Sequence, residues 1–135
     1  GPARRGAGVG AGGAVVGRSG ALGVAEAYEA TVRLVESGAD FTAMCIIADA
    51  MAIAAIKALE DCGRSVPRDC SVIAIDGLSL SEYTRPTLTT LCQPMARMGE
   101  ESVKILLDVM NGRTKSRHIV VETQFRAGAS IAPPA

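Results

Sequence analysis

From Val24 onward, short apolar runs alternate with amphipathic stretches, and this alternation constrains the fold more than any other feature. Apolar side chains recur at helical spacing in three stretches: residues 24–38, 49–63 and 94–112. Four runs have the length and apolar character of strands: residues 42–47, 71–75, 88–92 and 118–125. Strands that alternate with helices in this way indicate βαβ units. We therefore predict an α/β domain with a mostly parallel sheet and helices on both of its faces.

Local signals mark where these helices begin and end. A glycine closes each helical stretch, at Gly38, Gly63 and Gly112, and predicts its C-terminal end. Asp49 stands where the second helix should begin, and we predict that it caps the N-terminus of this helix. Pro94 suits the first turn of the third helix.

The composition argues against several classes of function. The 135 residues fit one domain, and 48% hydrophobic residues are enough to build a core. Lys and Arg together number 14, as do Asp and Glu, so the net charge of zero argues against a grip on nucleic acid by these residues alone. No apolar run reaches the length of a membrane span, and we find no secretory signal. We expect a cytoplasmic protein with no membrane partner.

The cysteines and the single histidine form no pattern typical of a metal or catalytic site. Cys45, Cys62, Cys70 and Cys92 contain no C-x-x-C pair, and His118 stands beside a strand-like run without a nucleophile motif. A zinc site would need ligands from scattered places. We expect buried free thiols, and no metal, cofactor or catalytic residue.

The run "GVGAGG", Gly8–Gly13, has the G-x-G-x-x-G spacing of a dinucleotide-binding turn. That turn needs a strand before it and a helix directly after it. The preceding "GPARRGA" is not strand-like, and the next helix begins about ten residues too late. We expect residues 1–20 to be a poorly defined glycine-rich arm, and residues 21–135 to form the domain.

Polar residues stand where three of the expected strands end. These are Ala48 with Asp49, Asp76 with Gly77, and Gln93. Ligands of open α/β sheets bind at the carboxyl ends of the strands, so this edge is the candidate site. Helix capping is the alternative explanation for Asp49, and turn chemistry is the alternative explanation for Asp76. Because capping is a sufficient reason for Asp49, we favour Asp76 as the ligand-binding carboxylate.

Residues 41–112 resemble the lactose-repressor/galactose-repressor family of bacterial transcription regulators. The family pattern has a strand after "TA", an Asn-Asp pair, "mA", "G..VP.D.sv.GfD" and then "P.LTT..qp...lG". The matching residues are Thr42, Ala43, Asp49, Met51, Ala52, Gly63, Val66, Pro67, Asp69, Ser71, Val72, Asp76, Pro86, Leu88, Thr89, Thr90, Gln93, Pro94, Gly99 and Gly112. The resemblance covers roughly residues 23–130, with Arg126 where the family usually has arginine.

The resemblance implies an incomplete type I periplasmic-binding-protein-like lobe. It implies the effector-binding and dimerisation core of a repressor that binds a sugar-like or nucleoside-like small molecule. Operator DNA would be bound only through an N-terminal helix-turn-helix domain that this chain lacks. The second helix would contribute to a homodimer interface, and the third would pack on the other lobe. The protein would not be an enzyme.

The resemblance also assigns site residues. The positions of Ala48 and Asp76 face the effector in the family, and Gln93 and Met95 match positions at its edge; Asp49 completes the candidate set. The chain departs from the family pattern at Ala48, which replaces the Asn of the Asn-Asp pair, and at Gly77, which replaces a second Asp. Loss of the Asn removes a group that can both donate and accept hydrogen bonds.

Two other classes of function remain as alternatives. A periplasmic sugar-binding protein of a transport system shares the two-lobed fold. The lack of a signal sequence, the four free cysteines and the "P.LTT..QP...G" pattern weigh against it. A nucleotide-dependent oxidoreductase depends on "GVGAGG" alone.

Overall fold

The structure is a computed structural model that describes residues 23–113 and 117–133. The run Gly8–Gly13 and the arm over residues 1–20 lie outside the described residues. Within these, the element order is α1 (Val24–Glu36), β1 (Ala43–Cys45), α2 (Asp49–Asp61), β2 (Ser71–Asp76), the 3-10 helix η1 (Ser79–Glu82), β3 (Thr89–Cys92), α3 (Met95–Met110) and β4 (Gln124–Arg126).

The four strands form one sheet in the order β1-β2-β3-β4. The first three are parallel, and β4 runs antiparallel to β3 at the edge. The α/β class with a mostly parallel sheet is therefore confirmed. The strand expected over 118–125 is much shorter than predicted: residues 117–123 form no regular structure, and pairing begins only at Gln124.

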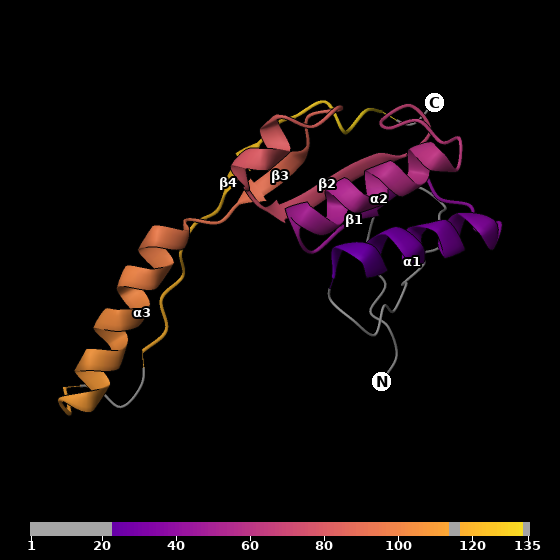
Figure 1. The fold of residues 1–135 in the computed structure, drawn as a ribbon. Coiled ribbons are helices and arrows are strands. Elements are labelled where there is room, and N and C mark those ends of the chain that lie inside the picture. The colour runs from indigo at the N-terminus through magenta and orange to yellow at the C-terminus, as the bar shows by residue number, and fades with distance from the viewer. Residues whose placement is uncertain (1–22, 114–116, 134–135) are drawn as a thin grey trace.

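The core lies between α2 and the sheet, and α1 packs against α2 (Figure 1). Small residues on α2, such as Ala52 and Ala58, are fully buried and let the helix approach its neighbours closely. Leu59 of α2 and Val72 of β2 are also fully buried. Burial of a side chain such as Leu59 contributes roughly 1.5–3 kcal/mol to folding.

The third helix does not cover the sheet. Figure 1 shows α3 projecting away from the sheet and the other helices, and none of its residues is buried. Its large apolar side chains are exposed, among them Leu106 at 58% and Met110 at 72%. Helix α3 therefore provides no helical cover for the second face of the sheet, and its packing on another lobe stays a prediction.

The glycines end the helices as predicted. Gly63 lies two residues beyond α2 with φ +78°, and Gly112 lies two residues beyond α3 with φ +68°. After α2, the amide of Gly63 donates to Glu60 O at 2.9 Å, and that of Arg64 donates to Leu59 O at 2.9 Å. These two bonds form a Schellman motif, which satisfies carbonyls at the end of the helix.

The four cysteines are free, but the expectation that they are buried is met only by Cys70. Cys45 is exposed, and Cys62 and Cys92 are half-buried. Among the helices of the described residues, we find none long and apolar enough to span a membrane.

Candidate functional site

The carboxyl edge of the sheet brings together Asp49, Asp76 and Gln93, as their positions at strand ends predicted. Gln93 Nε2 donates to Asp76 Oδ1 at 2.9 Å, and the Asp49 amide donates to Asp76 Oδ2 at 3.3 Å. The backbone amide of Gln93 also donates to the backbone carbonyl of Asp76 at 3.0 Å. Asp76 is therefore held from the start of α2 on one side and from the end of β3 on the other.

Asp76 is half-buried and has an unusual backbone conformation. Its φ is +148°, and Gly77 follows with φ +82°. Non-glycine residues rarely adopt such angles, and they do so mostly where the surrounding structure holds them. Each carboxylate oxygen has more than one acceptor site, so Asp76 can accept further hydrogen bonds from a hydroxyl group.

The prediction that Asp49 caps α2 is wrong. The N-cap position is Ala48, and no side chain bonds there; Asp49 is the first helical residue and is fully buried. Its backbone amide instead bonds to the carboxylate of Asp76, so Asp76 performs at the start of α2 the task expected of Asp49. The reason is that β2 ends beside the first turn of α2, which sequence spacing does not reveal.

The carboxylate of Asp49 accepts hydrogen bonds from four groups. Oδ2 accepts from the amides of Gly77 at 3.1 Å and Leu78 at 2.8 Å and from Ser81 Oγ at 3.1 Å. Oδ1 accepts from Thr90 Oγ1 at 2.5 Å. This buried carboxylate therefore joins α2, the loop after β2, η1 and β3.

Arg126 of β4 neutralises this cluster from the edge of the sheet. It lies 4.0 Å from Asp49 Oδ2, pairs with Glu82 at 2.6 Å, and donates to the Leu78 carbonyl at 2.8 Å and to Ser81 Oγ. Sequence reasoning noted Arg126 only through the family resemblance. Thr90 likewise stood out only as part of the family pattern, and Ser81 carried no signal, because neither type nor spacing distinguishes a buried hydroxyl from an exposed one.

The other two predicted site residues flank this cluster. Ala48 is half-buried and directly precedes Asp49. Met95 is the first residue of α3 and is 65% exposed. Ala48, Asp49, Asp76 and Gln93 thus share one edge of the sheet, and Met95 follows two residues after Gln93.

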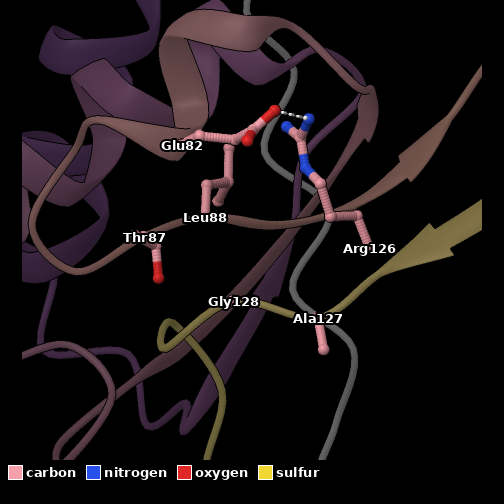
Figure 2. Close-up of a pocket in the computed structure, with 6 residues that line it drawn as sticks. All are labelled: Glu82, Thr87, Leu88, Arg126, Ala127 and Gly128. Atoms are coloured by element: carbon pink, nitrogen blue, oxygen red, sulfur yellow. Dashed lines mark hydrogen bonds and ion pairs between the residues drawn. The ribbon is translucent and has the colours of Figure 1, made fainter.

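None of these five residues lines the hollow of about 250 Å³ that lies on the other side of Arg126. Its lining residues are Glu82, Thr87, Leu88, Arg126, Ala127 and Gly128 (Figure 2). Figure 2 shows the Glu82 and Arg126 side chains pointing toward one another and joined as an ion pair. These two charges compensate each other in the wall of the hollow.

The edge at Asp76 has the chemistry of hydroxyl recognition. A carboxylate accepts strong hydrogen bonds, and the side-chain amide of Gln93 can both donate and accept. Within residues 23–113 and 117–133, no group of three or more His, Cys, Asp or Glu side chains is arranged to hold a metal ion.

Comparisons with known proteins identify the domain to which this edge belongs. A model of the periplasmic binding protein-like domain matches residues 13–131. The HTH-type transcriptional regulator MalR of Clostridium butyricum is 37% identical over 107 residues, which are 79% of this chain and 32% of that protein. The chain spans between about a quarter and a third of the length of the curated relatives it matches first.

Two solved structures show the same fold. The complex of transcriptional regulator CelR with cellobiose gives a TM-score of 0.72 at 30% identity, over 79% of this chain and 33% of that one. The lac repressor dimer bound to operator and the anti-inducer ONPF gives 0.73 at 26% identity, over 78% of this chain and 37% of that one. By its domain match, its relatives and its fold, the chain belongs to the lactose-repressor/galactose-repressor family of transcription regulators, within the periplasmic-binding-protein-like domain.

Proposed function

We propose that this chain is the effector-sensing and dimerisation part of a bacterial transcriptional repressor, and that its effector is a small sugar-like molecule. The observation that carries the proposal is the pair of Asp76 and Gln93, joined at 2.9 Å at the carboxyl edge of the sheet. A carboxylate and an amide together match the hydroxyl groups of a sugar. The relative bound to cellobiose supports this class of ligand.

The effector site consists of Asp76, Gln93, Met95 and Ala48, with Asp49 directly behind them. We assign residues 21–135 to this domain and residues 1–20 to an arm outside it. In the proposed mechanism, the effector binds two states of the protein with different affinity and so shifts the balance between them.

The same relatives support the proposed partners. We propose that operator DNA is bound by a helix-turn-helix domain of the whole protein, as the HTH-type name of the relatives supports. The 135-residue chain should show no sequence-dependent shift of operator DNA in a mobility assay, because its net charge is zero. We propose action in the cytoplasm, where the DNA lies, and no enzymatic activity; the named relatives are regulators rather than enzymes or transport proteins.

We also propose a homodimer, which the dimeric lac repressor supports. Helix α2 offers only part of its surface to a second copy, because Ala52, Ala55 and Leu59 are buried within the chain. Its free surface includes Lys57 and Glu60. Sedimentation equilibrium of the chain tests this proposal, and a monomer at all concentrations would contradict it.

An NMR titration with lactose, cellobiose and ribose tests the proposed site, because chemical shifts report even weak binding. Asp76→Asn should weaken binding of the sugar that binds wild type by roughly 1.5–3 kcal/mol, or about ten- to a hundredfold in Kd. Asp69→Asn is a matched control, since this carboxylate bonds to Ser65 and Arg68 before β2. Equal affinity of Asp76→Asn and wild type would refute the site.

A further inference from the structure

Asp49 bonds both to the side chain of Asp76 and to the turn that follows Asp76. The Asp49 amide donates to Asp76 Oδ2 at 3.3 Å, while Asp49 Oδ2 accepts from the amide of Gly77, the next residue, at 3.1 Å. The following amide, of Leu78, donates to the same oxygen at 2.8 Å. One residue of α2 thus bonds to the Asp76 side chain and to the two amides that follow it.

These two amides fix a backbone that needs support. Asp76 has φ +148° and Gly77 has φ +82°. Successive amides that converge on one anionic oxygen form a concave anion-binding turn. Here the anion is a side chain of the protein itself, and it holds the turn that sets the direction of the Asp76 carboxylate.

Asp49 itself cannot reach a ligand. Its exposed fraction is 0%, and both of its oxygens are already bonded, to donors in the loop, η1 and β3. Arg126 at 4.0 Å supplies the opposite charge that a buried carboxylate requires. A role as helix cap is excluded as well, because Asp49 lies within the helix and makes no capping bond.

We propose that Asp49 is a positioning residue for the effector site: its buried carboxylate holds the turn at Gly77 and Leu78, and thereby aims Asp76 and its partner Gln93 at the ligand. This inference rests on the proposed function, because it takes Asp76 as the residue that meets the effector. The geometry of the turn can nevertheless be tested without any ligand.

The first experiment compares Asp49→Asn with Ser130→Ala in the whole chain by amide hydrogen exchange. Ser130 is a matched control: it is fully buried and makes two bonds, from Thr89 N at 2.8 Å and to Val72 O at 2.6 Å, at the start of the strands. Asp49→Asn should raise exchange at Gly77 and Leu78 at least about tenfold more than in the strands, because a neutral amide accepts weaker bonds. Ser130→Ala should raise amide exchange in the turn and in the strands by similar factors.

The same two variants decide whether the effect reaches the ligand-binding pair. In Asp49→Asn, the chemical shift of the Gln93 side-chain amide should move toward the value of a solvent-exposed glutamine, because the hydrogen bond from Gln93 to Asp76 is lost. In Ser130→Ala it should stay in place. If both variants raise exchange uniformly, or if Gly77 and Leu78 keep their protection in Asp49→Asn, the carboxylate is only a contributor to overall stability and the proposal fails.

A titration with cellobiose, lactose and ribose completes the test. Where wild type binds one of them, Asp49→Asn should weaken that binding about tenfold or more, whereas Ser130→Ala should keep it. Unchanged affinity in Asp49→Asn would overturn the positioning role. If wild type binds none of the three, that result counts against the proposed function, and the exchange and resonance data still decide whether Asp49 holds the turn.

Discussion

Gly77→Ala should be among the most damaging small substitutions in this chain. Gly77 has φ +82°, and a Cβ placed on it would lie 2.6 Å from Cys92 Cβ and Sγ and 2.7 Å from Cys92 Cα. Carbon atoms in contact normally stand 3.5–4.0 Å apart, so the neighbouring strand would have to move by about 1 Å. That strand is held in register, with Asp76 opposite Cys92.

The cost has two parts that a control separates. An L-residue in the left-handed region costs roughly 1–2 kcal/mol, which the lower entropy of the unfolded chain offsets by about 0.4–1 kcal/mol. Gly63→Ala carries only this part, because Gly63 has φ +78° and open space around its Cβ position. Gly77→Ala adds an overpacking cost of about 1–3 kcal/mol. We therefore expect Gly77→Ala to lose about 1–3 kcal/mol more than Gly63→Ala.

Urea denaturation followed by circular dichroism measures both free energies of unfolding. Removal of the Cys92 sulfur in Cys92→Ala should not rescue Gly77→Ala, since the Cβ and Cα of residue 92 also block the added methyl group. If the two glycine variants lost equal stability, the strand would yield without cost, and the steric reasoning would be refuted.

Three further predictions concern the core, the thiols and the acid side of the stability curve. Leu59→Ala should lower the free energy of unfolding by about 2–5 kcal/mol, because Leu59 is fully buried. In the same denaturation assay, Leu80→Ala should stay within about 0.5 kcal/mol of wild type, because Leu80 is 62% exposed. Burial raises the pKa of the Cys70 thiol, so mass spectrometry at pH 8 should find Cys45 alkylated by iodoacetamide well before Cys70, and equal rates would contradict the burial of Cys70. Hydrogen bonds from Lys57 and Tyr28 hold the pKa of Asp61 below its ordinary value of 3.8, so their stabilising effect is present above that pH and is lost as the pH falls through the lowered pKa. In Asp61→Asn, the free energy of unfolding should fall less steeply with pH below about pH 3.8 than in wild type, and the difference should be smaller in high salt. An unchanged slope of this pH dependence at low salt would count against the two hydrogen bonds.

Much of the fold could be predicted from local pattern. The three helices appear where apolar side chains recur at helical spacing, and a glycine with positive φ follows each of them, at Gly38, Gly63 and Gly112. Strands β1 and β3 lie within the apolar runs, and β2 extends only one residue beyond its run, to Asp76. These features depend on side chains a few residues apart, so a sequence contains them directly.

The fourth strand shows where local pattern fails. Residues 118–125 have the composition of a strand, but only Gln124–Arg126 pairs with β3. A strand exists only where another strand offers it hydrogen bonds, and residues 117–123 have no such neighbour in the described part of the chain. Composition alone cannot supply that partner.

The sequence by itself determined that carboxylates and an amide stand at the ends of parallel strands, and therefore that Asp49, Asp76 and Gln93 meet at one edge. Only the tertiary structure decided their roles. Asp76 accepts a hydrogen bond from the amide of Asp49, which is 27 residues away. Asp49 in turn accepts one from Thr90, which is 41 residues away. Which carboxylate is buried and which remains open to a ligand depends on how α2 and the loop after β2 pack, because burial is a property of neighbours distant in sequence.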